Sequence, residues 1–281
     1  GWKLEWERYQ QWLVTDFLNR QAAIVNEYKR PDQFVTQDFA GPPRPYANEE
    51  EVSRALDIVA ANPYHDTQER YDGETTSFAG DYARSLKRTN YLVTETNAQT
   101  IGWDSKGQYP PYDGQLRLDV YTHIASGANM VEYWHWHSIH YGQETYWKGV
   151  LSHDLEPNRA YAEVGRIAHE LQRVGPQIVN TKRPNPVAVL YSNDSYHGIE
   201  FMPFSDRANY RTALTNLYRA LYKLNVGTDI IFPNSTSLAD YQVILVPPLY
   251  VASDALLNRL ADFVHGGGHV VMAFKSGFCN E

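Results

Sequence analysis

The sequence predicts an α/β protein in two parts. Apolar segments of strand length alternate with amphipathic helical segments along the 281 residues, and this alternation is typical of parallel sheets covered by helices. A proline-containing segment at 181–186 marks a change in the character of the chain. We therefore expect one α/β domain at residues 1–183 and a second at residues 184–281.

The first part begins with a long helix and continues with short strands. Apolar side chains recur at helical spacing over residues 3–28, and Pro31 ends the pattern. A helix at 112–126 separates the last two expected strands, so these strands form a parallel β-α-β unit. A closing helix follows Asn158. The helical positions of the first segment are Trp6, Tyr9, Leu13, Phe17, Ile24 and Tyr28, and the strands are expected at 34–39, 56–64, 90–96 and 129–136.

Four strands with their helices make only half of an eight-stranded TIM (β/α)8 barrel, since a whole barrel takes about 250 residues by itself. The sequence thus predicts a half-barrel in residues 1–183, with the other half outside this chain. Such a half-barrel would leave open sheet edges, and we expect it to be unstable alone.

The second part has the pattern of a doubly wound α/β domain, with strands expected at 187–191, 228–232, 241–246 and 268–273 and helices between them. The glycines between His265 and His269 follow a helix instead of opening one, so we expect a turn and not a phosphate-binding loop. Cys279 lies outside any nucleophile elbow, so amidotransferase chemistry is not supported.

Composition indicates a soluble enzyme of the cytoplasm. The formal net charge is -8 without a basic stripe, which argues against nucleic acid as a partner. No apolar run approaches the eighteen or so residues of a membrane span, and no signal peptide is visible. The single cysteine fits a reducing compartment. Aromatic residues make up 14% of the chain, which suits a ring-shaped ligand, although aromatics also fill cores.

The most informative segment is the strand that ends in Glu95. Apolar residues 91–93 suit a buried strand, and the polar residues 94–97 suit its opening into a pocket. A carboxylate there can attack an anomeric carbon, and the indole of Trp103 can cover a sugar ring. The alternative interpretation is a solvated or salt-bridged strand end.

Residues 90–166 resemble glycoside hydrolase family 42, the retaining β-galactosidases, because Trp103 follows Glu95 at the family's spacing of eight positions. The resemblance implies that Glu95 is the nucleophile at the end of the seventh barrel strand and that Trp103 lines the galactose site. It also implies that Tyr64 contacts the sugar near the nucleophile and that Glu144 bonds galactose hydroxyls. Trp147 stands where some members have a histidine, which suggests stacking on the substrate instead.

The same resemblance assigns the four strands to the second half of the barrel. It implies that the general acid/base, a Glu at the end of the fourth strand, precedes this chain. It further implies that residues 184–281 form a flavodoxin-like trimerisation domain, similar in fold to glutamine amidotransferases, and hence a homotrimer. Asn26-Glu27-Tyr28 imitates the acid/base motif, but its helical context argues against that role. Glu132 is a further carboxylate, for which a structural role is favoured.

Several histidines invite a metal interpretation. His135, His137 and His140, with Glu144 nearby, have donor atoms that zinc accepts. The intervening tryptophans and the lack of an HExxH or cysteine motif favour hydrogen bonding around a sugar pocket instead. The sequence predicts neither a metal nor a cofactor.

The sequence therefore predicts part of a retaining β-galactosidase, inactive by itself because the acid/base is missing. Two alternatives stay open. An α-L-arabinopyranosidase would act on a ring that differs by one hydroxymethyl group, a difference worth only about 1–3 kcal/mol in binding. A non-catalytic scaffold would bind sugar or assemble copies without cleaving the substrate.

Overall fold

The computed structural model describes residues 1–41, 43–205 and 208–280, which form two compact units. One unit, here called the first-sheet unit, comprises residues 36–43 and 58–182. The other, the second-sheet unit, comprises residues 1–35, 44–57 and 183–281. Residues of the second-sheet unit therefore precede and follow those of the first-sheet unit, and residues 44–57 stand between its two segments.

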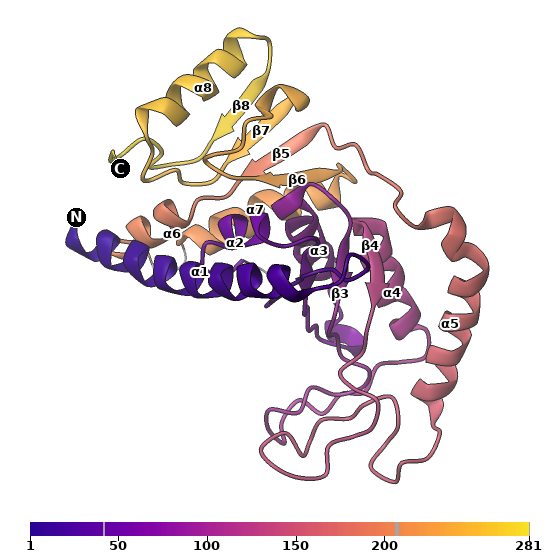
Figure 1. Cartoon of the computed structure of the whole chain (residues 1–281). Coiled ribbons are helices and arrows are strands. Elements are labelled where there is room, and N and C mark those ends of the chain that lie inside the picture. The colour runs from indigo at the N-terminus through magenta and orange to yellow at the C-terminus, as the bar shows by residue number, and fades with distance from the viewer. Residues whose placement is uncertain (42, 206–207, 281) are drawn as a thin grey trace. The chain divides into compact units, whose positions relative to one another are not determined.

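The first-sheet unit is built on four parallel strands in the order β1-β2-β3-β4, and the last two, β3 and β4, are labelled in Figure 1. The four expected strands and the parallel pairing of the last two are thus confirmed. The strands are shorter than expected because only two to four residues of each lie in the sheet. Ala60, Tyr91 and Val93 have no exposed surface, which explains why these segments are apolar throughout. The bounds are β1 (Asp38–Phe39), β2 (Ala60–Ala61), β3 (Tyr91–Val93) and β4 (Ala128–Val131).

Helices connect the strands of this sheet. The connections contain η1 (Gln68–Arg70), α3 (Gly73–Lys87) and α4 (Gln115–Ser126), and α5 (Arg159–Ile178) follows β4. The sequence analysis missed α3, because its buried side includes the charged pair Asp81 and Arg84, 2.6 Å apart, and so lacks a continuous apolar stripe. The predicted α4 and α5 are present and pack on one another through Leu116, Val120 and Ile167.

The second-sheet unit contains the predicted doubly wound pattern. Its strands are parallel, in the order β6-β5-β7-β8, so the chain starts in the interior of the sheet and extends to both sides (Figure 1). Ala188 and Ile244 lie at the centre of its core without exposed surface. The strands are β5 (Val187–Leu190), β6 (Thr228–Ile231), β7 (Val243–Val246) and β8 (His269–Met272), and the helices are α6 (Asn193–Glu200), α7 (Tyr210–Lys223), η2 (Leu238–Asp240) and α8 (Asp254–His265).

Two N-terminal helices, α1 (Trp2–Tyr28) and α2 (Glu49–Arg54), also belong to the second-sheet unit, although the sequence-based boundary at residue 183 groups them with the first part. Arg8 of α1 pairs with Asp194 of α6 at 2.7 Å. The predicted long helix is confirmed, but its apolar side is exposed in this chain, with Trp6 and Phe17 each 60% exposed. Glu27 lies exposed in the last turn of the helix and does not follow a strand.

None of the helices in the described ranges is long and apolar enough to cross a membrane.

Gly80 allows α3 to approach its neighbours closely. A Cβ at this position would lie 2.4 Å from the Tyr91 hydroxyl oxygen and 2.7 Å from Ser126 Cβ. We expect Gly80→Ala to lower the free energy of unfolding by about 1–3 kcal/mol, because a close-packed core cannot yield that space. Gly165→Ala is the matched control in α5, where an added Cβ meets nothing within 4 Å, and it should stabilise by about 0.5–1 kcal/mol. Urea unfolding measures both, and equal effects would contradict the packing argument.

Candidate active site

The carboxyl edge of the first sheet gathers the polar residues that follow each strand. Glu95 comes two residues after β3, and Tyr64 comes three residues after β2. The backbone around Glu95 is fixed on both sides, since the Thr94 N–H donates to the Ala61 carbonyl at 3.1 Å and the Thr96 N–H donates to the Glu132 carbonyl at 3.0 Å. The neighbouring strands thus set the direction of the Glu95 segment.

Tyr64 and Glu95 meet directly. The Tyr64 hydroxyl donates a hydrogen bond of 2.7 Å to Glu95 Oε2. Burial raises the pKa of Tyr64, and the bond to Glu95 raises it further. The phenol therefore stays protonated at working pH and remains a donor to the carboxylate.

A second carboxylate at this edge was missed by the sequence analysis. Asp38 of β1 accepts a bond of 2.6 Å from Thr94 Oγ1. Burial raises the pKa of Asp38 and the nearby charge of Glu95 adds to this, while hydrogen bonds from Thr94 and Asn62 oppose the rise. The signal was present in the sequence, because Asp38 stands near the end of an expected strand, where side chains face the site.

Aromatic rings form one wall beside Tyr64. Trp147 lies edge-on to Tyr64 and to Trp103, with ring centroids 5.1 Å apart in both pairs. Its Nε1 donates to the Trp134 carbonyl at 3.0 Å, and only 1% of the residue is exposed. Trp103 is 66% exposed. Trp103 thus offers an open face to a ligand, while Trp147 stands buried behind it.

Glu144 completes the set of predicted residues. It is half-buried, and its carbonyl accepts the Trp147 N–H at 2.9 Å. Its negative charge also acts on the Tyr64 hydroxyl. The structure therefore brings together all five predicted residues, which are Tyr64, Glu95, Trp103, Glu144 and Trp147.

The remaining candidates occupy other surroundings. Glu132 directly follows β4, and its side chain is exposed. The rings of His135 and His137 lie 4.9 Å apart, and those of His137 and His140 lie 6.0 Å apart. Burial lowers the pKa of His135, as does the neighbouring His137. Within the described part of the chain, no group of three or more His, Cys, Asp or Glu residues is arranged to hold a metal ion.

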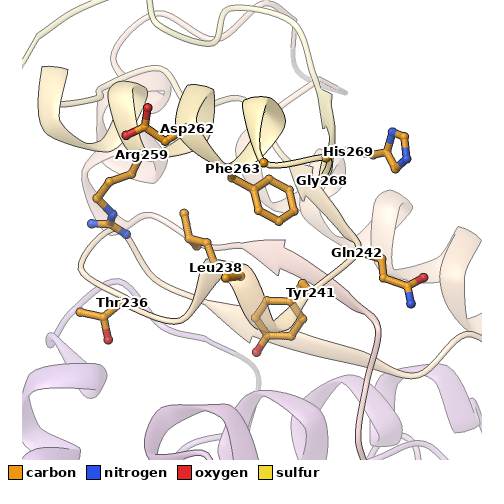
Figure 2. Close-up of a pocket in the computed structure, with 12 residues that line it drawn as sticks. Thr236, Leu238, Tyr241, Gln242, Arg259, Asp262, Phe263, Gly268 and His269 are labelled. Atoms are coloured by element: carbon orange, nitrogen blue, oxygen red, sulfur yellow. The ribbon is translucent and has the colours of Figure 1, made fainter.

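A separate pocket of about 680 Å³ lies in the second-sheet unit, beside η2, α8 and the glycine turn (Figure 2). The Arg259 guanidinium donates hydrogen bonds to the carbonyls of Pro233 and Ser235. The N–H groups of the three glycines at 266–268 donate to the carbonyls of residues 262, 264 and 263, so they are not free for an anion. The predicted turn between α8 and β8 is confirmed.

A parallel α/β sheet whose carboxyl edge carries a tyrosine-bound carboxylate and an open indole is typical of sugar-processing barrel enzymes. Residues 1–174 match the family model for β-galactosidases of glycoside hydrolase family 42, and residues 185–281 match that of the β-galactosidase trimerisation domain. The chain belongs to glycoside hydrolase family 42. The resemblance inferred from Glu95 and Trp103 is thereby confirmed.

Known relatives agree. The β-galactosidase BgaA of Clostridium cellulovorans is 29% identical over 99% of this chain, and the β-galactosidase Bga of Halorubrum lacusprofundi is 30% identical over 98%. The chain spans 42% and 40% of their respective lengths. The solved H. lacusprofundi β-galactosidase has a TM-score of 0.88 at 27% identity, over 97% of this chain and 42% of that one. The enzyme from Bacillus circulans sp. alkalophilus reaches 0.90 at 25% identity, over 99% and 41%.

The raised pKa of Asp38 has a consequence for stability. A carboxyl whose folded pKa lies above its unfolded value costs stability once pH passes the unfolded pKa, because the fold then holds a disfavoured charge. We expect Asp38→Asn to raise the melting temperature at pH 7, and the gain should shrink as pH falls towards 4. Thermal unfolding at several pH values measures this. A gain that does not depend on pH would exclude the charge as its cause.

Proposed function

We propose that the chain is the nucleophile-bearing second half of a (β/α)8 barrel, residues 1–183, followed by a trimerisation domain, residues 184–281, of a retaining β-galactosidase. The observation that carries this proposal is the hydrogen bond from Tyr64 to Glu95 at the carboxyl edge of the sheet. This bond fixes Oε2 of Glu95, so that Oε1 can attack an anomeric carbon. The family membership and the β-galactosidase names of the relatives support the substrate class.

In this mechanism a Glu95 oxygen forms a bond to C1 of galactose while the bond from C1 to the aglycone oxygen breaks. The general acid gives its proton to that leaving oxygen. The same group, as a base, then takes a proton from the water that releases galactose and restores the Glu95 carboxylate. Tyr64 orients the carboxylate through both steps.

We assign the acid/base to a residue outside this chain. Asp38 is a carboxylate close enough to feel the Glu95 charge, but it accepts hydrogen bonds from Thr94 and Asn62 and lies on the same sheet edge. A retaining enzyme needs a carboxyl on the other side of the glycosidic bond. The chain spans about two fifths of the length of its relatives, which leaves ample sequence to supply that group.

The other residues take binding roles. Trp103 stacks on the apolar face of the sugar, because its ring is open. Glu144 accepts hydrogen bonds from sugar hydroxyls. Trp147 is buried and supports the wall formed with Tyr64. The match to the trimerisation domain supports a homotrimer. The single cysteine is consistent with a reducing compartment such as the cytoplasm.

An α-L-arabinopyranoside remains the alternative substrate, because its ring differs from that of galactose by one hydroxymethyl group, which is worth only about 1–3 kcal/mol in binding. A non-catalytic scaffold is less well supported, since a scaffold has no need for an oriented carboxylate. Comparison of kcat/KM for nitrophenyl galactoside and arabinopyranoside separates the two substrates.

Covalent labelling tests the nucleophile. We expect a 2-deoxy-2-fluoro-β-galactoside to trap an adduct on Glu95 in the polypeptide that contains this sequence, as seen by intact mass and peptide mapping. The labelled enzyme should have an intact mass well above the 32.2 kDa of this chain. Residues 1–281 alone should give no label and no turnover, and normal activity from them would contradict the assignment of the acid/base.

Tyr64→Phe removes the donor to Glu95 while keeping the ring. We expect kcat to fall by about 10- to 100-fold, because a hydrogen bond to a charged group contributes about 1.5–3 kcal/mol. Tyr161→Phe is the control and should leave kcat unchanged, because Tyr161 lies in the first turn of α5 with its residue 40% exposed and the substitution keeps its ring. An unchanged kcat in Tyr64→Phe would rule out the orienting role.

A further inference from the structure

We propose that the buried ion pair between His65 and Asp119 is a positioning device for Tyr64, and through Tyr64 for Glu95. This role rests on the galactosidase function proposed above. Neither residue touches the sugar site directly, so both are positioning residues and not catalytic ones.

His65 directly follows Tyr64, and its side chain is 5% exposed. Its Nδ1 lies 2.9 Å from the Asp66 carbonyl oxygen, and its Nε2 lies 3.0 Å from Asp119 Oδ1. Both ring nitrogens therefore face oxygen acceptors. Only the doubly protonated imidazolium has an N–H for each of them, because neutral imidazole would present a lone pair to one oxygen.

Asp119 lies on α4 without any exposed surface. Among the described residues, no donor forms an aligned hydrogen bond to either of its carboxylate oxygens. His65 is its nearest cation, and His123 Nε2 lies farther away at 3.6 Å. The Asp119 charge is thus balanced mainly by the His65 charge, and loss of the His65 proton would leave an unbalanced buried carboxylate.

The electrostatics agree with this geometry. Burial alone lowers the pKa of His65, but the charge of Asp119 and the contacts with Asp119 and Asp66 raise it above its usual value. Burial also lowers the pKa of His123, which stays neutral. The Tyr91 hydroxyl lies 3.2 Å from His123 Nδ1 and donates to the His123 carbonyl at 3.3 Å.

Three tyrosines lie near the ion pair of His65 and Asp119. Burial raises the pKa of Tyr91 and of Tyr133, so these phenols stay protonated beside Asp119. Tyr71 lies edge-on to the His65 ring at 5.3 Å. The groups that act on or contact His65 and Asp119 are Asp66, Tyr71 and His123. Tyr91 and Tyr133 lie beside Asp119, and the charged groups that act on these tyrosines are Asp81, Arg84 and Glu163.

Two hydrogen bonds connect the chain around Tyr64 to the Glu95 segment. The His65 N–H donates to Asn97 Oδ1 at 3.2 Å, and Asn97 is two residues beyond Glu95. Thr96 Oγ1 donates to the Pro63 carbonyl at 2.8 Å. The chain is therefore tied to the Glu95 segment on both sides of Tyr64, and the ion pair of His65 with Asp119 ties it to α4 as well. We expect loss of the ion pair to let the end of β2 shift, and the Tyr64 hydroxyl with it.

The sign of the pH dependence follows from the raised His65 pKa. The ion pair is present below that pKa and is lost as pH rises through it. Reactivity of Glu95 should therefore decline on the alkaline side for a reason that is independent of the general acid.

The test measures trapping of the enzyme that contains this chain by 2,4-dinitrophenyl 2-deoxy-2-fluoro-β-galactoside. Dinitrophenolate leaves without a proton from the general acid. The trapping rate thus reports Glu95 and the groups that position it. Asp119→Asn is made alone and in the Tyr64→Phe background, and Asn158→Ala, which removes the N-cap of α5, is the control for lost stability.

We expect Asp119→Asn alone to slow trapping by about 10-fold at neutral pH and to move the alkaline decline to lower pH. In the Tyr64→Phe background it should change the rate by less than about 2-fold, because the residue through which it acts is already disabled. Asn158→Ala should have the same small effect in both backgrounds. If Asp119→Asn fails to fold, the double variant His65→Gln Asp119→Asn replaces it, and its trapping rate should not decline at alkaline pH.

Equal losses from Asp119→Asn in both backgrounds, or an alkaline profile identical to that of the parent, would overturn the positioning role. The same holds if the double variant retains the parent's alkaline decline. Absence of label on Glu95 in the parent enzyme would instead overturn the proposed function, so the two failures are distinguishable.

Discussion

Parallel pairing of β1 to β4 is the constraint on which the candidate active site depends. Each strand pairs through only two to four residues, so backbone bonds beyond the strand ends, such as that from the Thr96 N–H to the Glu132 carbonyl, extend the alignment to the site. They fix the direction in which the chain leaves each strand. Tyr64 and Glu95 therefore meet at 2.7 Å although 31 positions separate them.

Buried charge is the second constraint, and it connects the helical layer to the sheet. Asp81 pairs with Arg84 within α3, and Asp119 of α4 pairs with His65 after β2. A buried charge tolerates few alternative partners, because leaving it unpaired costs several kcal/mol. Such pairs contribute less to net stability than apolar packing does, but they favour one arrangement of helix and strand end.

Local patterns account for what the sequence predicts well. Glu95 and Tyr64 each follow a short apolar run, and that pattern marks a strand end without knowledge of the fold. α3 was missed because a helix that buries Asp81 and Arg84 has no continuous apolar stripe. Asp38 was missed because assigning a strand end from sequence alone is uncertain by a few residues, enough to hide its position at the edge. The long helix α1 was predicted because its apolar residues recur at helical spacing, and in this chain that apolar side is exposed.

The sequence by itself determined where the strands of both sheets and the helices α1, α4 and α5 lie, which polar residues follow β2 and β3, and the family to which the chain belongs. These properties lie in short stretches of sequence, where spacing and residue type are sufficient. Only the tertiary structure decided that Asp38 neighbours Glu95, that Trp147 is buried while Trp103 is open, and that both nitrogens of His65 face oxygen acceptors. The physical reason is that these contacts join residues far apart in the chain, so they depend on strand order, register and side-chain rotamers.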